Sequence, residues 1–398
     1  MLTYNSLSEE QHEAVDLCAD RSKMLVGVTG EAGSGKTSVL KFVHDQLCED
    51  ESAHIALVAP TGRAAKRIQE ATGIPAKTIH RFMRWSVPVD DEDSGLPAYD
   101  KFNKYPFNTV LVDEASMMNE ELYRALIDAL PPRGVIRFFG DANQLPPVEG
   151  KSPFLQLLEK FPSIRLTKNF RSDDGIVTAA RQIVSGRVPE SNSQFTMLNP
   201  GTGNMLPAVM QFIDDSFRGL GSQLIIPTKV GKYGCEALNN HLQQKLNENK
   251  KHLVIKYKDK EGHDDIRKFK IGDKMIWTKN DYKLNLFNGM IGWVEDLDDD
   301  TGEIVLNIED KSIVIPTHIE SYNADGRAIF QYDPRKNISL AYAITTHKAQ
   351  GSEFDRVVLL LNRSYVLNRA NFYTAVTRAK KTATVVLGAG ALATALKK

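Results

Sequence analysis

Short apolar runs alternate with amphipathic segments through the first part of the chain. Strands are expected at residues 23–28, 54–59, 108–113 and 135–139. Each run is mostly apolar, which is typical of strands that lie in a parallel sheet between layers of helices. Small or polar residues stand at the ends of the runs: Thr29, Pro60, Asp113 and Gly140. Ligands of such sheets bind outside the carboxyl ends of the strands, so this edge is where we expect a site.

A second α/β series follows, with an interruption. Strands are expected at residues 223–226, 338–345, 356–361 and 383–387, and helices near residues 235–247 and 368–380. Between residues 251 and 336 the pattern becomes alternating and rich in turns, and Asn288-Gly289 is typical of a tight β-hairpin. We therefore expect a small β-barrel inserted in the second series. Residues 83–107 have neither a helical nor a strand period, and they interrupt the first α/β series.

Composition is that of an ordinary multidomain soluble protein. The chain has 398 residues, of which 42% are hydrophobic and 25% charged. No apolar run approaches the roughly 18 residues that span a bilayer, and the N-terminus lacks the pattern of a signal peptide, so we expect a cytoplasmic protein without a membrane partner. Cys18, Cys48 and Cys235 are far apart and in no metal-ligand spacing, which favours reduced structural thiols.

Charge is balanced overall but not locally. Lysine plus arginine and aspartate plus glutamate both number 50. Residues 250–283 carry a balance of +5, whereas residues 295–310 carry −8. One side of the inserted domain would then favour a polyanion. Two solvated surfaces explain the same distribution equally well.

Residues 30–37 read Gly-Glu-Ala-Gly-Ser-Gly-Lys-Thr, between the first expected strand and a helix-like segment. A loop of this spacing binds a nucleoside triphosphate: its backbone N–H groups point at phosphate oxygens, Lys36 reaches the β- and γ-phosphates, and Thr37 helps to hold Mg²⁺. Kinases, GTPases, motors and ligases share this loop. The loop therefore predicts the ligand but not the reaction.

Further candidates follow the later strands. Asp113 and Glu114 end an apolar strand, as expected of an acid pair in which Asp113 holds Mg²⁺ and Glu114 activates the attacking water. Gln144 follows the next strand and is placed to sense the γ-phosphate. Arg171 and Arg378 are candidates for arginines that contact that phosphate. Each has a plainer alternative when it is taken singly. The acid pair could be a solvated surface, the Gln144 segment a capped turn, and the two arginines surface charges.

Eight segments in order decide between these interpretations. They are GEAGSGKT, APTGRAAKRI, TIH, DEAS, GDANQLPP, LTKNFR, THKAQGSEFDRVV and YTAVTRAKK. This series resembles the helicase motifs of superfamily 1 over nearly the whole chain, and the last two segments are most similar to the RecD and Dda branch. The resemblance implies an α/β fold with two RecA-like parallel-sheet domains, a small excursion in the first and an SH3-like β-barrel in the second.

The resemblance also implies domain boundaries. The first RecA-like domain would comprise residues 1–82 and 108–165, and its pin-like insertion residues 83–107. The second would comprise residues 166–250 and 337–398, with the barrel at residues 251–336. The excursion carries the acidic stretch Asp90-Asp91-Glu92-Asp93, which would repel phosphates, so this element favours translocation over strand separation.

Site residues are carried over from the motifs. The resemblance implies an ATP site, with Gln11 reading adenine, formed by Gln11, Gly30, Gly33, Ser34, Gly35, Lys36, Thr37, Ser38, Gly351 and Glu353. Catalysis would rest on Lys36, Thr37, Asp113, Glu114, Gln144, Arg171 and Arg378, with Mg²⁺ held by Thr37 and Asp113. Contacts to DNA phosphates would come from Pro60, Thr61, Thr78, His80, Thr346, His347 and Lys348. Gln350 would link the last of these segments to the nucleotide. A place in the hydrophobic core is an equal alternative to a DNA contact for His80.

The implied activity is ATP-driven movement 5′ to 3′ on single-stranded DNA, with unwinding of tailed duplex DNA. A translocase that displaces proteins with little unwinding, and an RNA helicase, share these motifs. A monomer is expected, in a bacterial or phage-infected cell, with a single-strand-binding or a replication or recombination protein as a candidate partner. Phe82, Trp85, Trp277, Tyr282 and Phe287 are candidates for base stacking, with small cores as the alternative.

Overall fold

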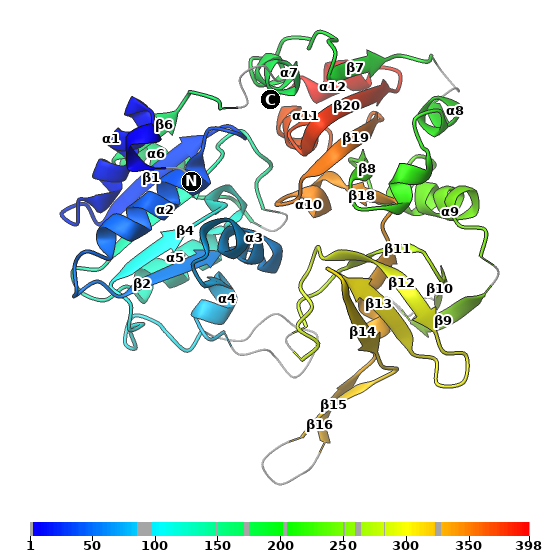
Figure 1. Cartoon of the computed structure of the whole chain (residues 1–398), viewed down its shortest axis with the longest axis horizontal. Coiled ribbons are helices and arrows are strands. Elements are labelled where there is room, and N and C mark those ends of the chain that lie inside the picture. The colour runs from blue at the N-terminus through cyan, green and yellow to red at the C-terminus, as the bar shows by residue number, and fades with distance from the viewer. Residues whose placement is uncertain are drawn as a thin grey trace. The chain divides into compact units, whose positions relative to one another are not determined.

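The computed structural model describes residues 3–85, 97–147, 150–170, 175–201, 205–249, 251–258, 264–281, 283–322 and 328–397. The chain divides into two compact units, Met1–Val177 and Thr178–Lys398, and each is traced in Figure 1. No helix in the described part of the chain has the length and apolar character that crossing a membrane requires. Cys18 and Cys235 are buried free thiols and Cys48 is an exposed one.

The first unit is built on a parallel sheet in the order β3-β2-β4-β5-β1-β6 (Figure 1). The strands are β1 (Leu25–Gly30), β2 (Ile55–Ala59), β3 (Ala76–Thr78), β4 (Thr109–Val112), β5 (Val135–Gly140) and β6 (Ser163–Leu166). The four predicted strands are confirmed as β1, β2, β4 and β5. The edge strands β3 and β6 were not predicted. Strand β3 has only three residues, which are too few to show a period. Strand β6 is not an apolar run, because alternate residues are exposed.

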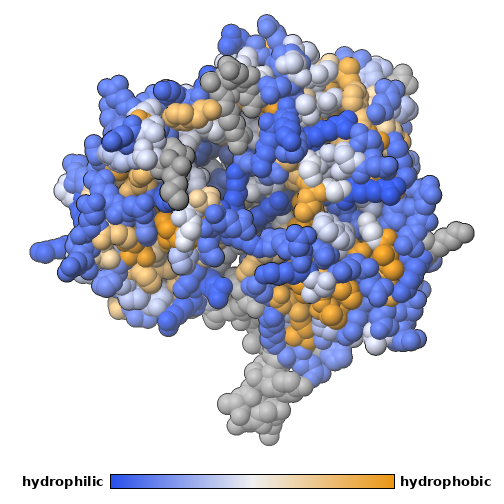
Figure 2. All heavy atoms as spheres, viewed as in Figure 1, coloured by the Kyte–Doolittle hydropathy of each residue, from blue (hydrophilic) through white to orange (hydrophobic). Residues whose placement is uncertain are grey.

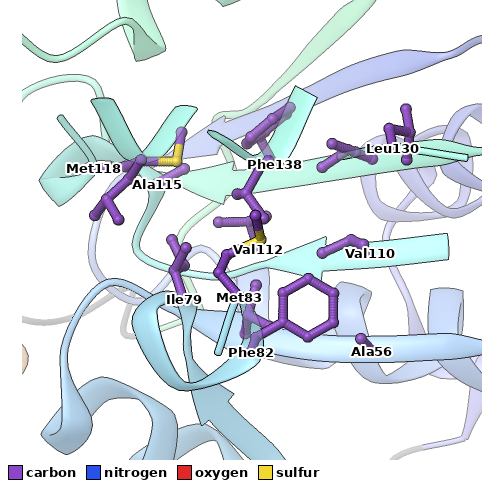
Figure 3. Close-up of a cluster of buried hydrophobic side chains, with 14 of the residues drawn as sticks. Ala56, Ile79, Phe82, Met83, Val110, Val112, Ala115, Met118, Leu130 and Phe138 are labelled. Carbon is purple, nitrogen blue, oxygen red and sulfur yellow. The ribbon is translucent and has the colours of Figure 1, made fainter. Parts of the chain in front are cut away.

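Helices cover both faces of this sheet. They are α1 (Glu9–Ala19), α2 (Lys36–Leu47), α3 (Gly62–Thr72), α4 (Ile79–Phe82), α5 (Glu120–Asp128) and α6 (Phe154–Lys160), with 3₁₀ turns η1 (Tyr4–Ser6) and η2 (Ala115–Met117). Along β4, Val110 and Val112 enter one hydrophobic core and Leu111 enters the other. Figure 3 shows the first core, where Phe138 of β5 and Phe82 of α4 join the β4 valines. Burial on both faces explains why the strands are continuously apolar.

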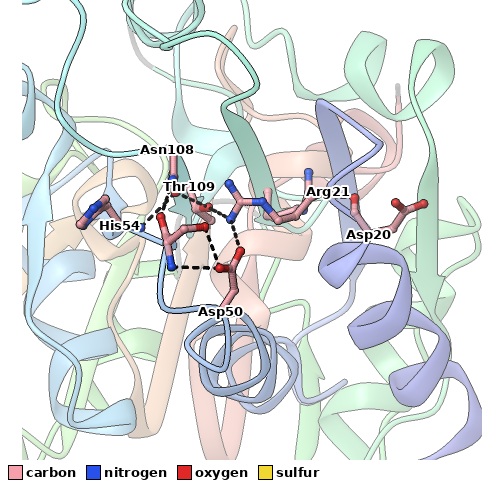
Figure 4. Close-up of polar contacts among 8 residues, drawn as sticks. Asp20, Arg21, Asp50, His54, Asn108 and Thr109 are labelled. Carbon is pink, nitrogen blue, oxygen red and sulfur yellow. Dashed lines mark hydrogen bonds and ion pairs between the residues drawn. The ribbon is translucent and has the colours of Figure 1, made fainter.

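A polar cluster ties together the amino ends of the strands, at the edge opposite the expected site (Figure 4). Arg21 Nη1 donates to Thr109 Oγ1 at 3.2 Å and lies 3.8 Å from Asp50 Oδ2. The His54 N–H donates to Asn108 Oδ1 at 3.0 Å. The cluster connects the segments that lead into β1, β2 and β4, so it fixes where these strands begin.

Arg137 of β5 is fully buried and faces the loop that precedes β1. Its guanidinium donates to the carbonyls of Cys18 and Asp20 at the end of α1, and to those of Lys23 and Met24. Burial lowers the pKa of Arg137 to about 10, which leaves it charged at neutral pH. A positive group at a helix C-terminus is stabilising. Arg137 therefore connects the end of α1 to the strand that carries the loop at residues 30–37.

The second unit contains a parallel sheet in the order β18-β8-β19-β20-β7 (Figure 1). The strands are β7 (Phe195–Leu198), β8 (Ser222–Ile226), β18 (Ala343–Thr345), β19 (Phe354–Leu361) and β20 (Ala379–Leu387). The helices and the 3₁₀ turn of this unit's α/β part are α7 (Gly175–Val184), α8 (Met205–Met210), α9 (Cys235–Leu246), α10 (Thr346–Ala349), α11 (Arg369–Val376), α12 (Ala391–Ala395) and η3 (Asp215–Arg218). The 3₁₀ turn η4 (Pro334–Asn337) lies in the inserted β-barrel instead. The predicted helix at residues 368–380 was too long, since α11 ends at Val376 and β20 begins at Ala379.

A β-barrel part is inserted between α9 and β18. Its main antiparallel sheet has the order β14-β13-β12-β11-β17. The strands are β11 (Lys274–Trp277), β12 (Ile291–Leu297), β13 (Ile304–Ile308), β14 (Lys311–Ile315) and β17 (Ile338–Leu340), with ribbons β9 (His252–Lys258) with β10 (Asp264–Lys270) and β15 (Ile319–Tyr322) with β16 (Ala328–Tyr332). The predicted strand at residues 338–345 is two strands, because β17 pairs in the barrel and β18 pairs in the parallel sheet.

The expected hairpin at Asn288-Gly289 is a turn of a different kind. The Met290 N–H donates to the Phe287 carbonyl at 3.0 Å, and Gly289 has φ +93°. The paired strands are β11 and β12, which a loop from Thr278 to Met290 separates. The turn therefore sets the start of β12 and does not join two adjacent strands.

Candidate nucleotide site and strand-facing loops

The phosphate loop follows β1 and leads directly into α2. Gly33 and Gly35 have φ of +85° and +81°, a region that favours glycine. Gly35 is the N-cap of α2, and no side chain caps the helix there. Lys36 Nζ donates to the carbonyls of Gly30 at 2.6 Å and Glu31 at 3.0 Å, which holds its ammonium group over the loop. Backbone N–H groups, a helix N-terminus and a lysine thus converge where an anion would bind.

Polar side-chain atoms without a protein partner are buried around this loop. In the described part of the chain they include Ser34 Oγ of the loop, Ser116 Oγ of η2 and Gln144 Oε1 after β5. A buried polar atom that lacks a partner is costly, so such atoms mark where a ligand or water is to be bound. The three residues follow β1, β4 and β5, at the carboxyl edge of the sheet. They fit a phosphate-bearing ligand.

Asp113 and Glu114 follow β4 at the same edge. The Asp113 N–H donates to the Val58 carbonyl at 2.9 Å, so the residue continues the sheet. Burial, and next the neighbouring Glu114 carboxylate, raise the pKa of Asp113, while Lys36 and Arg67 of α3 act in the opposite direction. Glu114 has φ +51°, an unusual conformation for a residue with a side chain and one that is typical of functional sites.

Gln144 lies in the loop after β5 and is almost fully buried. Its Nε2 makes a long contact of 3.4 Å to Asp141 Oδ2, and Asp141 Oδ1 accepts from the Asn143 N–H at 3.0 Å. The Ala142 N–H donates to Thr29 Oγ1 of β1 at 3.2 Å. The Ala142 bond connects the loop after β5, which carries Gln144, to the strand that leads into the phosphate loop.

Gln11 touches the phosphate loop itself. Its Nε2 donates to the Ser34 carbonyl at 3.2 Å, and its Oε1 accepts from the Ser8 N–H at 3.0 Å in the capping box of α1. The side chain is buried, and a Cβ on Gly35 would lie 2.3 Å from its Nε2. Both ends of this amide already bind the protein. The adenine contact expected of Gln11 stays a prediction.

Two residues after β6, Asn169 and Phe170, also contact the loop, and neither was a candidate in the sequence analysis. Because β6 pairs with β1, the chain beyond Leu166 runs beside the loop. Asn169 Nδ2 donates to the Ala32 carbonyl at 2.8 Å, and the Phe170 N–H donates to the Gly33 carbonyl at 3.1 Å. Glu10 of α1 accepts from the N–H groups of Thr167 at 2.7 Å and Lys168 at 3.1 Å.

Phe170 presents an aromatic ring next to the phosphate loop. Its side chain is 49% exposed, and its ring lies 3.7 Å from the position of a Cβ on Gly35. An exposed aromatic face at this place suits stacking on a flat base. The signal in the sequence was an aromatic residue directly before Arg171. Arg171 itself lies outside the described residues.

In the second unit, the expected nucleotide residues gather where β19 and β20 begin. The Phe354 N–H donates to the Arg378 carbonyl at 2.8 Å, and Glu353 Oε2 lies 3.6 Å from Lys380 Nζ. Gly351 has φ +70°, and a Cβ there would meet open space. The Arg378 side chain is 3% exposed and donates to the carbonyls of Thr374 and Ser352. Gln350, also expected here, is buried beside them.

The expected DNA-facing residues of the second unit lie on α10. Thr345, which was not a candidate, is the N-cap of α10 and accepts from the Lys348 N–H at 3.3 Å. Thr346 is fully buried and its hydroxyl donates to Asn371 Oδ1 at 3.0 Å, so it supports the loop from inside. His347 and Lys348 are half-buried, and burial lowers the pKa of both.

The expected DNA-facing residues of the first unit lie at or just after the ends of β2 and β3. Thr61 accepts from the Ala64 N–H at 3.2 Å as the N-cap of α3, and Thr78 accepts from the Arg81 N–H at 3.1 Å as the N-cap of α4. Pro60 is half-buried at the end of β2. His80 is exposed rather than in the core, and its ring lies 5.2 Å from that of Trp85.

The aromatic candidates for base stacking mostly fill cores. Phe82 and Trp277 are buried, and Trp85 and Phe287 pack against hydrophobic clusters. Tyr282 lies outside the described residues, as does most of the expected pin, residues 86–96. At the base of this excursion Arg84 lies over the Tyr99 ring at 5.5 Å.

Three family models match the chain. An AAA domain matches residues 6–199, the SH3 domain of ATP-dependent RecD-like DNA helicases matches residues 238–307, and the UvrD-like helicase C-terminal domain matches residues 340–386. The second match covers α9 and the first strands of the barrel. The third covers α10 and α11 with their flanking strands, β18, β19 and β20.

Two curated relatives and one solved structure show the range of similarity. The ATP-dependent RecD2 DNA helicase of Deinococcus radiodurans is 33% identical over 385 residues, which are 94% of this chain and 48% of that protein. The ATP-dependent DNA helicase dda of Enterobacteria phage T4 is 31% identical over 196 residues, 47% of this chain and 44% of that protein. The chain therefore spans about half the length of the RecD2 relative.

The Pif1 helicase from Bacteroides, solved in complex with ADP-AlF3 and single-stranded DNA, has a TM-score of 0.59. It is 22% identical, and the match covers 97% of this chain and 96% of that one. This likeness shows the fold: two RecA-like sheets with a barrel inserted in the second.

Proposed function

The chain belongs to the RecD/Dda-like branch of the superfamily 1 helicases, and we propose that it is an ATP-driven DNA helicase that moves 5′ to 3′ on single-stranded DNA. One observation supports this most strongly. Lys36 at the start of α2, Asp113 after β4 and Gln144 after β5 all lie at the carboxyl edge of one parallel sheet, and each has the chemistry that hydrolysis of a triphosphate requires.

Each residue has a role in hydrolysis. Lys36 would exchange its bonds to the Gly30 and Glu31 carbonyls for bonds to the β- and γ-phosphates. Glu114, held next to Asp113, would orient the attacking water and take its proton. The unpartnered Gln144 Oε1 would accept from that water. The alignment of these groups, rather than covalent chemistry by the protein, would supply most of the rate enhancement.

Thr37 and Asp113 would hold the expected Mg²⁺. Within the described residues no group of three or more His, Cys, Asp or Glu side chains could hold a metal ion alone. Mg²⁺ at a nucleotide site needs one or two protein ligands, because the phosphates and water complete its octahedron. When bound, the ion neutralises charge on the phosphates. It would also favour the ionised form of Asp113, against the effect of burial.

The arginines and the DNA contacts are further parts of the proposal. Arg378 would have to leave the Thr374 and Ser352 carbonyls to reach a phosphate. Thr61, Thr78 and Thr345 each cap a helix, which leaves the neighbouring N–H groups to meet DNA phosphates without reading sequence. His80, His347 and Lys348 would add to these contacts. The domain boundaries, a monomeric state and a cytoplasmic location belong to the same proposal.

DNA-stimulated ATP hydrolysis tests this proposal. We expect single-stranded DNA to accelerate hydrolysis, Lys36→Ala to abolish it and Glu114→Gln to bind ATP without turnover. Hydrolysis that is insensitive to DNA, or wild-type turnover by Lys36→Ala, would refute it. Single-stranded RNA of the same length should be the weaker activator. Equal or stronger activation by RNA would favour the RNA helicase instead.

The acidic stretch of the excursion favours a second candidate, a translocase that displaces bound proteins with little unwinding. Release of streptavidin from the 3′ end of biotinylated single-stranded DNA would occur under both proposals. Release without any separation of tailed duplexes would decide for the translocase.

A further inference from the structure

The ribbon of β9 and β10 has one edge closed by the protein. On β10, the Lys268 carbonyl accepts from Gln243 Nε2 of α9 at 3.1 Å, and the Lys270 N–H donates to Asp273 Oδ2 at 2.7 Å. Asp273 is buried and also accepts from Asn247 Nδ2 at 2.7 Å and the Tyr342 hydroxyl at 3.0 Å. The outward-pointing backbone groups of β10 are therefore held by the body of the second unit.

The other edge, along β9, is open. In an antiparallel pair, opposed residues alternate between exchanging hydrogen bonds and pointing their backbone groups away from each other. Lys268 is opposed to Val254, and Ile266 to Lys256. Since the Lys268 backbone points away from β9, the N–H and C=O groups of Val254 and Lys256 point away from β10. Among the strands that the structure describes, β9 pairs with β10 alone.

The side chains of these residues share one face of the ribbon. Val254 is 44% exposed and Ile266 is 60% exposed, and they lie diagonally across the two strands. Lys256 and Lys268 are also exposed and occupy the other diagonal. The opposite face carries Ile255 and Phe269 of the barrel core. Figure 2 shows hydrophobic areas among hydrophilic ones on the surface of the barrel.

We propose that this edge binds an extended acidic segment of a partner protein, which adds to β9 as a further strand. The open row of N–H and C=O groups matches a peptide backbone, and a nucleic acid has no equivalent row. Val254 and Lys256 are two positions apart on β9. They complement a segment in which an acidic and an aliphatic residue are also two positions apart, because only every second side chain of a strand points to the same face. This face has no Phe, Tyr or Trp among its described residues, so it lacks the aromatic platform on which bases stack.

Fluorescence anisotropy with the full chain and a synthetic peptide tests the proposal. The probe is a nine-residue fluorescein-labelled peptide with threonine at the odd positions and aspartate and valine in turn at the even positions, so that aspartate and valine share one face of the added strand. We expect saturable binding that weakens by about tenfold or more when serine replaces valine or lysine replaces aspartate in the peptide. Equal binding of the three peptides would overturn the proposal.

Variants of the chain locate the binding. Ile266→Thr removes apolar surface, the pair Lys256→Glu and Lys268→Glu reverses the charge, and Val254→Pro removes an outward N–H from an edge strand that tolerates proline. Each should weaken binding, whereas Val314→Thr, on a 52% exposed valine of the barrel strand β14, should not. DNA-stimulated ATP hydrolysis should be unchanged in all of them. That result shows that the variants are folded.

Two further outcomes would overturn the proposal. Displacement of the peptide by oligothymidylate would assign the face to nucleic acid. Sedimentation of the wild-type chain as a dimer that Val254→Pro dissociates would assign the edge to a second copy of the chain.

Discussion

Gln11 donates from its side-chain Nε2 to the Ser34 carbonyl at 3.2 Å, and this bond joins the first helix to the phosphate loop. The same amide accepts from the Ser8 N–H. The start of α1 and the loop that would hold the phosphates are thus one hydrogen-bonded assembly. A change at residue 11 is expected to move the loop even though Lys36 and Thr37 are intact.

Gln11→Glu should therefore impair nucleotide binding. The substitution removes the donor and places a carboxylate oxygen against the Ser34 carbonyl, a buried mismatch that costs about 1–3 kcal/mol. We expect the KM for ATP to rise by roughly tenfold or more with a smaller change in kcat, as steady-state hydrolysis would show. Gln69→Glu is the matched control, because Gln69 Oε1 only accepts, from the Ala76 N–H, and glutamate retains that acceptor. Equal KM values for the wild type and Gln11→Glu would contradict the account.

Phe170→Ala should weaken binding of ADP. Loss of the exposed ring beside Gly35 removes a stacking contact of about 0.5–1.5 kcal/mol, which corresponds to a two- to tenfold increase in Kd for a fluorescent ADP. Phe170→Tyr should bind normally. Phe102→Ala is the control, since Phe102 is 85% exposed in the same unit. Inorganic triphosphate has no base, so its binding should not change. A parallel loss of triphosphate binding would show that the ring only supports the loop.

Arg137→Met should destabilise the first unit. The carbonyls of Cys18, Asp20, Lys23 and Met24 lose their donor on substitution, and the expected cost is about 3 kcal/mol or more. Urea unfolding followed by the signal of the first unit measures this cost. Arg124→Met is the matched control, since Arg124 is exposed and its pair with Glu120 contributes only a few tenths of a kcal/mol. A similar midpoint for both variants would contradict the role of Arg137.

Asp214 should make the second unit sensitive to acid. A hydrogen bond from Ser216, and next the bond from Arg356, lower the pKa of Asp214 to about 2 from its ordinary value of 3.8. Because the folded pKa is the lower one, this contribution to stability is complete above about pH 4 and is lost as the pH falls towards 2.

Asp214→Asn should thus lower the thermal midpoint at pH 5 and flatten its fall between pH 4 and 2. The neighbouring Asp215→Asn, at a side chain that is 86% exposed, should leave the profile unchanged. An identical acid profile for the wild type and Asp214→Asn would exclude the proposed contribution.

The fold was largely predictable because burial on both faces makes parallel strands visible as apolar runs. The same signal failed where one run crosses two sheets, as at residues 338–345, where β17 and β18 are separated by only Ala341 and Tyr342. No feature of the local sequence distinguishes β17 from β18. Their different partners, β11 and β8, are distant in sequence.

The candidate site was predictable where a motif has a local geometry, as in the phosphate loop. Asn169 and Phe170 were missed because their contacts to Ala32 and Gly33 depend on the pairing of β6 with β1. Thr346 was expected at the surface, but it is buried, and Thr345 caps the helix instead. A one-residue shift along a helix start is enough to exchange a surface hydroxyl for an internal one.

Strand displacement with duplexes that carry either a 5′ or a 3′ single-stranded tail tests the central claim most directly. The account predicts ATP-dependent separation from the 5′ tail alone, and no separation by Lys36→Ala on either tail. Separation from the 3′ tail would contradict the proposed direction. Separation by Lys36→Ala would contradict the proposed site.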